Sequence, residues 1–261
     1  MKHHIHSDLL TDKVNVLVVG AGGTGSQILS VLARQHHAML AFGHPHGLDV
    51  MLWDDDTVSE TNLFRQAFYP CDVGSYKSHV VINRINLGFG TQWKSEVKRL
   101  SENDKLSNFD IIIGCVDNRA GRQAILKAWN KGQSYSNSYW LDCGNRLSDG
   151  QIVLGELPGT RAKQERDILP HVGNLYPELL DPFLDETDVM PSCSVAEALE
   201  KQSLFVNSAM AMYAGNILNE LFRHGAIDIH GYFVNLKTGR SSPLEVDPVA
   251  WERMGYRRQV V

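Results

Sequence analysis

Three aspartates stand side by side in the segment WDDDTVSETNLFRQ, residues 53–66, which ends on Arg65 and Gln66. Adjacent carboxylates repel one another, and burying an unpaired charge is costly. The cluster is therefore either a solvated loop or part of a site whose ligand supplies cations or hydroxyl groups. The guanidinium and the carboxamide that follow are hydrogen-bond donors, which would suit an anionic ligand.

A second group of residues combines tight spacing with glycine. The sequence GAGGTG places Gly20, Gly22 and Gly25 in the spacing G-x-G-x-x-G, between an apolar run and a helical pattern. Glycines permit a tight turn and a close approach of the backbone to phosphate, and the start of the following helix favours negative charge. The spacing alone is weak evidence, because a merely structural tight turn can also produce it, but its position between strand and helix predicts nucleotide binding.

Further polar residues follow the apolar runs. In a doubly wound sheet, an acid at the end of the second strand reaches ribose hydroxyls; Asp54 is best placed, with Asp56 close behind. Arg65 and Lys77, the latter in GSYKS, suit a triphosphate. Asp117 in CVDN could hold Mg²⁺ together with phosphates. Each residue alone could equally be a solvated loop charge or an Asx turn, but their joint position at strand ends favours a site.

Apolar runs and helical periods alternate along the chain, which predicts an α/β fold with a doubly wound, largely parallel sheet and helices on both faces. Residues 36–47 are expected to form a loop. Strands are expected at 14–20, 48–56, 91–100, 109–118, 138–145 and 151–157, with a closing C-terminal pair at 231–236 and 242–246; helices are expected from Thr24 and at 78–89, 119–132 and 194–225.

Residues 158–192 interrupt this alternation with prolines, acids and no clear period. Long irregular segments inside a compact domain usually have a function. We therefore expect a crossover-loop insertion within a single domain spanning residues 1–261.

Composition narrows the class of protein. Apolar residues make up 43% of the 261 residues and the net charge is -5, so nothing overall favours nucleic acid. No apolar run approaches the roughly 20 residues of a membrane span, and the N-terminus has no secretory pattern. We expect a cytoplasmic protein with reduced thiols and, without any C-x-x-C pair, no structural zinc. The cysteines are Cys71, Cys115, Cys143 and Cys193.

Together, VLVVGAGGTGS, DDDTVSETNLFRQ, VGSYKS and CVDN resemble motifs of the ThiF/MoeB/ubiquitin-activating superfamily of adenylating enzymes, which has a Rossmann-like fold. The second motif is the most specific of the four. The resemblance covers about residues 14–155 and continues more loosely through the helix after Cys193. Within the superfamily, the chain is most similar to the ThiF-like component of the PRTRC group associated with mobile elements.

This resemblance implies a homodimeric enzyme that uses ATP and Mg²⁺ to adenylate the C-terminal carboxylate of a small ubiquitin-like (β-grasp) or sulfur-carrier protein. Cations and positioning would neutralise the charge between the two anions that react. The implied roles are ribose binding for Asp54, phosphate binding for Asn62, Arg65, Gln66 and Lys77, and Mg²⁺ positioning for Asp117, with Asn118 beside it.

Cys193 lies in MPSCSVAEAL, where a helix is expected to start. Thiols near helix N-termini can have lowered pKa values and greater nucleophilicity. The sequence C-S-V-A resembles a family pattern in which the cysteine accepts the activated chain as a thioester. The alternative is a small buried hydrophobe, the role that we expect for Cys71, Cys115 and Cys143.

Other functions remain open because the chain departs from the family. No arginine precedes Gly20, although many members carry an N-terminal arginine that reaches the partner subunit's ATP site. A tRNA-modifying dehydratase of the same fold and a catalytically weak nucleotide-binding scaffold are the main alternatives. A nicotinamide-dependent oxidoreductase would leave NLFRQ and VDN unexplained. The histidine clusters HHIH and HPH are expected to bind metal only adventitiously, and Trp129, Trp140 and Phe205 to belong to the core.

Overall fold

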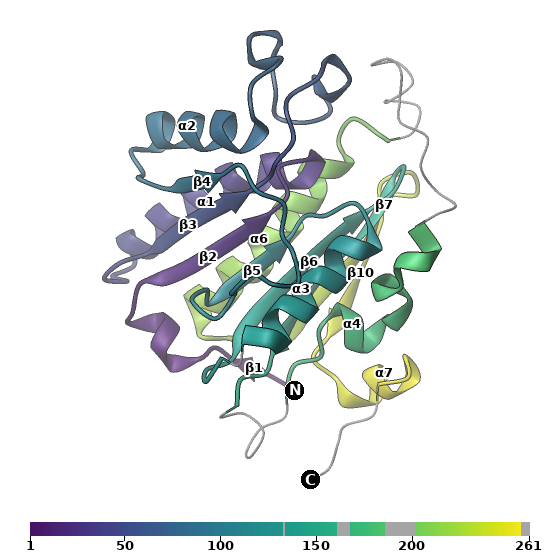
Figure 1. Ribbon diagram of the computed structural model, residues 1–261. Coiled ribbons are helices and arrows are strands. Elements are labelled where there is room, and N and C mark those ends of the chain that lie inside the picture. Colours follow the sequence, from purple (N-terminus) through teal and green to yellow (C-terminus); the bar gives the residue numbers. More distant parts are fainter. Residues whose placement is uncertain (133, 161–167, 186–201, 257–261) are drawn as a thin grey trace.

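A mixed eight-stranded sheet forms the centre of the protein (Figure 1). The computed structural model describes residues 1–132, 134–160, 168–185 and 202–256. The strand order is β10-β9-β7-β6-β5-β2-β3-β4. The strands are β2 (Val14–Val19), β3 (Leu48–Trp53), β4 (Lys94–Glu96), β5 (Ile111–Gly114), β6 (Ser138–Asn145), β7 (Asp149–Leu157), β9 (Ile229–Asn235) and β10 (Arg240–Glu245).

Five neighbouring strands, β4, β3, β2, β5 and β6, run parallel. The central strands are apolar on both faces because helices cover both sides, as the continuous runs predict. The remaining strands β7, β9 and β10 are antiparallel, so the expected closing C-terminal pair is present. A separate short pair, β1 (His3–His4) and β8 (Ala226–Ile227), joins the N-terminus to the end of the last long helix.

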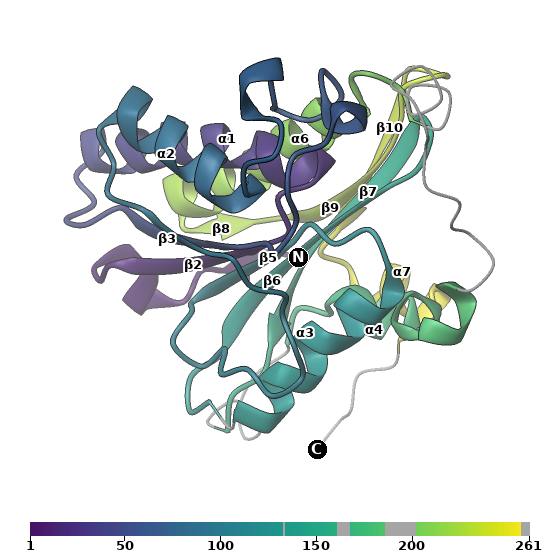
Figure 2. The same ribbon diagram turned by 45° about the horizontal axis from the view of Figure 1, so that its top comes forward.

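The helices form a layer on each face of the sheet, which confirms the doubly wound α/β fold. Figure 2 shows α1 (Gly23–Ala41), α2 (Lys77–Phe89) and α6 (Val206–His224) on one face. The other face carries α3 (Arg119–Gly132), α4 (Val172–Leu175) and α7 (Pro248–Arg253). Among the described residues, no helix combines the length and apolar character that crossing a membrane requires.

Three boundaries differ from the sequence prediction. Helix α1 continues to Ala41, because Met39 still faces the core, and only 42–47 connect it to β3. Strand β4 has three residues, since it is an edge strand that pairs with β3 alone. Within the described residues, α6 begins at Val206; it ends as predicted, before Gly225 in the left-handed conformation with φ 67°.

The described parts of residues 158–192 contain short helical turns rather than a continuous irregular loop. After α4 come η5 (Pro177–Leu180) and η6 (Pro182–Asp185), each starting with a proline at a position where the missing N–H costs little. Cys193 and its neighbours 186–201 lie outside the described residues.

The core contains Trp129 and Trp140 as predicted, each at most 2% exposed. Phe205 was expected there, but it occupies the N-cap of α6 and is 67% exposed, so that prediction is wrong. Cys143 is buried in β6, whereas Cys71 is exposed in η3 (Pro70–Asp72), so the expected packing role does not hold for Cys71.

Candidate functional site

A cavity of about 590 Å³ opens at the carboxyl ends of the parallel strands. Gly20 follows β2, Asp54 follows β3, Asp117 lies beyond the end of β5, and Asn145 ends β6; all four line the cavity. This edge is where ligands bind in open α/β sheets. The sheet thus gathers polar residues from four separate segments.

Four helices begin at this cavity. Gly23 of α1, Lys77 of α2, Ala120 of α3 and Asn207 of α6 are each the first or second residue of their helix, and all line it. Helix N-termini present free N–H groups and the positive end of the helix dipole. Their convergence makes the cavity suited to an anionic ligand.

The glycine loop between β2 and α1 forms part of the wall. Gly20 has φ 94°, and a Cβ there would lie 2.8 Å from the Cys115 carbonyl oxygen. Gly25 does not line the cavity; a Cβ on it would lie 1.9 Å from the Gly20 carbonyl oxygen, so glycine lets α1 approach the loop. Gly22 does line the cavity, and a Cβ on it would meet nothing within 4 Å.

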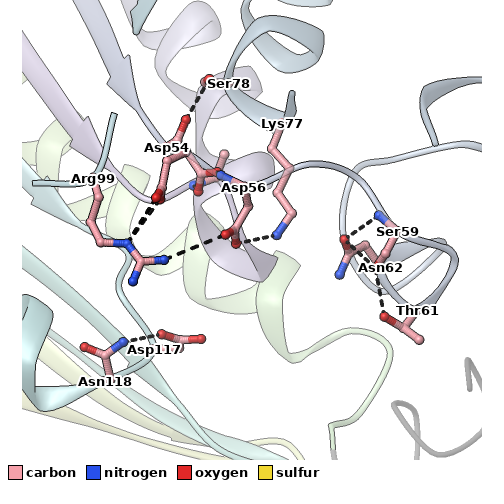
Figure 3. Close-up of polar contacts among 12 residues, drawn as sticks. Asp54, Asp56, Ser59, Thr61, Asn62, Lys77, Ser78, Arg99, Asp117 and Asn118 are labelled. Atoms are coloured by element: carbon pink, nitrogen blue, oxygen red, sulfur yellow. Dashed lines mark hydrogen bonds and ion pairs between the residues drawn. The ribbon is translucent and has the colours of Figure 1, made fainter. Parts of the chain in front are cut away.

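Asp54 holds the glycine loop against the end of β3. Its carboxylate accepts hydrogen bonds from the backbone N–H of Ala21 at 2.6 Å and of Asp56 at 2.9 Å. Its backbone carbonyl accepts a bond from the Ser78 hydroxyl at 3.0 Å (Figure 3). Burial raises the pKa of the Asp54 carboxyl, against the opposing effects of the Ala21 N–H and Lys77.

Asp56 is more exposed and lies between two cations (Figure 3). The Lys77 ammonium is 3.0 Å from one carboxylate oxygen, and the Arg99 guanidinium is 3.9 Å from the other. Arg99 also pairs with Asp55 through Nε at 3.2 Å. Asp56 is therefore the acid of this segment that faces the charged part of the cavity.

Four cations line the cavity: Arg65, Lys77, Lys98 and Arg99. Lys98 is already engaged, because its ammonium lies 4.0 Å from the centre of the Trp53 ring and 2.6 Å from Asp104. The other three stand near carboxylates that an anionic ligand could replace in part. This set supplies the positive charge that a polyphosphate requires.

Arg65 and Gln66 carry buried polar atoms with unmet hydrogen-bonding capacity. Arg65 Nε and Gln66 Oε1 have no hydrogen-bond partner among the described residues. Burial lowers the pKa of the Arg65 guanidinium, and the negative charge of Asp117 opposes that shift. Buried polar groups are normally paired, so these orphaned atoms fit a ligand that brings its own donors and acceptors.

Asp117 and Asn118 form the turn between β5 and α3, and both line the cavity. The Asn118 amide donates to Asp117 Oδ1 at 2.9 Å, and its oxygen accepts from the Gly121 N–H at 2.7 Å. No group of three or more metal-binding side chains occurs in the described parts of the chain. A single carboxylate together with substrate phosphates is nevertheless a usual way to hold Mg²⁺, so Asp117 fits that ion.

Asn62 is not among the residues that line the cavity. Its Oδ1 accepts hydrogen bonds from the Ser59 N–H at 2.9 Å and the Ser59 hydroxyl at 3.1 Å. Figure 3 shows it on a loop apart from Asp54 and Asp117. In this structure Asn62 closes the turn that precedes Arg65.

The cavity also contains residues that the sequence did not single out: Arg99, Asp185, Gln202 and Asn207. Arg99 follows β4, but the expected strand at 91–100 contained it. Asp185, the last residue of η6, caps the start of α3. Its carboxylate accepts hydrogen bonds from the backbone N–H groups of Arg119 at 2.9 Å and Ala120 at 3.0 Å. Asn207 gave no signal, because an asparagine within a helical pattern is usually a surface residue.

The histidine-rich N-terminus lies away from this cavity and has a structural use. His3 Nε2 is 2.7 Å from the Tyr139 hydroxyl, and His6 Nε2 is 2.6 Å from Glu156 Oε1. These contacts fasten the first residues to β6 and β7. In the second cluster, His44 Nδ1 accepts a hydrogen bond from the Gly47 N–H at 2.9 Å.

Three curated relatives share part of the sequence. The adenylyltransferase and sulfurtransferase UBA4 of Yarrowia lipolytica is 34% identical over 116 residues, which are 42% of this chain and 26% of that protein. Ubiquitin-like modifier-activating enzyme 5 of Oryza sativa is 26% identical, over 48% of this chain and 31% of that protein. The Nedd8-activating enzyme E1 catalytic subunit of Drosophila melanogaster is 26% identical, over 72% of this chain and 40% of that protein. The chain thus matches two fifths or less of each.

Solved structures share the fold. The crystal structure of E. coli MccB with ATP aligns with a TM-score of 0.58 and 16% identity, covering 90% of this chain and 64% of that one. The crystal structure of PaaA aligns with a TM-score of 0.56 and 15% identity, covering 89% of this chain and 64% of that one. The family model described as the ThiF family matches residues 9–247. The chain therefore belongs to the ThiF family.

Proposed function

We propose that this protein is an ATP-dependent adenylyltransferase that activates the C-terminal carboxylate of a small ubiquitin-like or sulfur-carrier protein. The observation that carries the proposal is the cavity, which is lined by four helix N-termini, four cations, two residues with orphaned polar atoms, and Asp117. The printed names of the relatives, an adenylyltransferase and two modifier-activating enzymes, support it.

The residues divide into two groups around a bound nucleotide. Asp54, directly after β3, would bind the ribose hydroxyls, with the more exposed Asp56 beside it. Arg65, Gln66 and Lys77 would hold the phosphates, with the N–H groups of the glycine loop beside them. Mg²⁺ held by Asp117 would supply further charge neutralisation on the phosphates.

The reaction joins two anions. A carboxylate oxygen of the substrate forms a bond to the α-phosphorus, and the bond to the bridging oxygen of pyrophosphate breaks, so that pyrophosphate leaves with the electron pair. Arg65 and Lys77 would lower the barrier by offsetting the negative charges that must approach and separate. Holding both reactants in one enclosed cavity would supply the remaining positioning.

A second step, transfer of the acyl group to Cys193, is part of the proposal. The thiolate would attack the acyl carbonyl and release AMP. Cys193 lies outside the described residues, but Asp185 and Gln202 flank its segment and both line the cavity. Cys193 is eight positions beyond Asp185, a span of at most ~28 Å. We further infer a homodimer, which light scattering of the purified protein would test.

ATP–pyrophosphate exchange tests the adenylation step. We expect exchange only when a cognate small partner protein with an intact C-terminus is present. Asp117→Ala should reduce the exchange rate by roughly a hundredfold or more, because it removes charge neutralisation at the phosphates. Asp49→Ala is the matched control, since Asp49 is a partly exposed acid paired with Lys13 on the surface.

Different outcomes separate the alternatives. Exchange that is lost in Asp117→Ala and kept in Asp49→Ala supports adenylation, and Cys193→Ala then tests the thioester by mass spectrometry of the adduct. ATP binding without exchange for any partner would favour the nucleotide-binding scaffold. ATP hydrolysis that depends on added tRNA would favour the dehydratase. Either result would overturn the proposal.

A further inference from the structure

A buried asparagine connects the separate segments that build one wall of the cavity. Asn207, the second residue of α6, is 1% exposed. Its oxygen accepts hydrogen bonds from Asn145 Nδ2 at 2.7 Å and from the Thr24 hydroxyl at 3.4 Å. Its amide nitrogen donates to the Arg65 carbonyl at 3.2 Å and to Gln202 Oε1 at 3.1 Å. One side chain thus links the starts of α1 and α6, the end of β6 and the loop that carries Arg65.

The same network holds Arg65 at both ends. Gln202 Oε1, which accepts from Asn207, also accepts from the Arg65 guanidinium at 2.5 Å. Gln202 is held in turn through its own amide nitrogen, which donates to Asn145 Oδ1 at 3.2 Å. The backbone carbonyl and the guanidinium of Arg65 are therefore both fixed by neighbours that Asn207 orients.

We propose that Asn207 is a positioning residue of the nucleotide site, whose carboxamide sets the direction in which the Arg65 guanidinium enters the cavity. The inference rests on the proposed function, in which Arg65 binds phosphate. A buried hydrogen-bond network in a low-dielectric wall is rigid, and rigid support preserves the geometry of a charged contact. A carboxamide is needed because the side chain at this position accepts two hydrogen bonds through its oxygen and donates two through its nitrogen.

Space at this position is also limited. A Cβ placed on Gly23 would lie 2.1 Å from Asn207 Oδ1, so the start of α1 packs directly on the carboxamide. Asn207→Asp keeps the size and an acceptor oxygen toward Asn145, but it puts an oxygen opposite the Arg65 carbonyl. Asn207→Ala removes both functions. The pair of variants separates loss of the donor from loss of the whole side chain.

The test is the affinity for ATP, measured by calorimetry on the full chain, in a double-mutant cycle with Arg65→Ala. In the wild-type background, Asn207→Asp and Asn207→Ala should each raise the dissociation constant about tenfold, the effect of a hydrogen bond or two. In the Arg65→Ala background, Asn207→Ala should alter it less than twofold, because the group that Asn207 positions is gone, whereas Asn207→Asp should keep only the loss caused by its added negative charge beside the phosphates. Asn216→Ala, at an exposed asparagine of the same helix, should change neither value.

Gln202→Ala keeps the inference testable if the Asn207 variants fold poorly. Gln202 lies outside α6, and its replacement removes the oxygen that accepts the hydrogen bond from the Arg65 guanidinium. Like the Asn207 variants, it should lower the affinity for ATP only when Arg65 is present. Equal losses in Asn207→Ala with and without Arg65, or unchanged affinity in Asn207→Ala, would overturn the inference alone. A wild-type protein that binds no ATP would overturn the proposed function, and the inference with it.

Discussion

Phe64, inside the NLFRQ sequence, is the one non-glycine residue with positive φ among those described, at 64°. Its side chain is 62% exposed, so packing does not compensate for the strained backbone. The left-handed conformation costs a residue with a Cβ on the order of 1 kcal/mol, and less for asparagine. We expect Phe64→Asn to raise the free energy of unfolding in urea by about 1 kcal/mol. The strained residue lies directly before Arg65, which lines the cavity.

Phe183→Asn is the matched control, because Phe183 is another exposed phenylalanine, 81% accessible, whose φ is not positive. It should leave the stability within about 0.5 kcal/mol of the wild type. An equal gain in both variants would show that removing an exposed ring, rather than relieving the backbone, explains the effect. If Phe64→Asn also lowers ATP affinity, the strained turn contributes to the orientation of Arg65.

At the level of single residues, the strand-end rule located several acids that line the candidate cavity but not the use of each side chain. Sequence could place Asp54 and Asp56 near a ligand, because both directly follow a parallel strand. It could not show that the Ala21 N–H occupies Asp54, or that Asn62 closes a turn, since neighbouring backbone decides both. Asn207 was out of reach, because its partners come from segments distant in the sequence.

At the level of elements, the contact between α1 and the glycine loop depends on Gly25. A Cβ there would lie 1.9 Å from the Gly20 carbonyl oxygen, and backbone on both sides leaves little room for adjustment. We expect Gly25→Ala to lower the free energy of unfolding by about 2 kcal/mol or more and to weaken ATP binding, because α1 must move away from the loop. Urea denaturation and calorimetry measure the two effects.

Gly88→Ala controls for the change of residue type. Gly88 lies within α2, and a Cβ on it would meet nothing within 4 Å. Alanine favours helix over glycine, so stability should rise by up to about 1 kcal/mol. Similar behaviour of the two variants would contradict the close packing of α1 on the loop.

The order and type of most elements could be predicted because apolar periodicity reflects burial on the sheet. Their ends were less predictable. Helix α1 runs past His36 and His37 because tertiary packing of Met39 outweighs the loop-like composition, and β4 is short because it has a neighbour on one side only. The strand-end rule did not identify Arg99, because the expected strand at 91–100 contained it, whereas β4 ends at Glu96.

At the level of the whole molecule, the cavity and the opposite part of the sheet have different tasks. The carboxyl ends of the parallel strands carry the charged groups that line the cavity. Elsewhere the antiparallel strands bury neutral histidines: His230 Nδ1 donates to the Leu154 carbonyl at 2.7 Å and its Nε2 accepts from Trp251 at 3.0 Å, while His171 Nδ1 accepts from the Gly173 N–H at 3.1 Å. Protonation would break the bonds that these rings accept.

This arrangement predicts an acid-sensitive fold. Burial lowers the pKa of His171 and of His230 from 6.5 to about 4. Between these values the unfolded chain binds more protons than the folded one, so stability is complete above pH 6.5 and is lost as the pH falls toward 4. Each ring should cost about 2 kcal/mol between pH 7 and pH 5, a range in which ordinary carboxylates stay largely ionised.

Urea unfolding at pH 7, 6 and 5 measures this loss, and His230→Gln should remove about half of it because glutamine does not titrate. The exposed His46→Gln is the control and should leave the pH dependence unchanged. A pH profile that is the same in His230→Gln and the wild type would mean that other groups cause the acid sensitivity. Because Trp251 belongs to α7, the acid-induced change should include this helix, and the difference in fluorescence between the wild type and Trp251→Phe, in a chain with five tryptophans, would report its local opening.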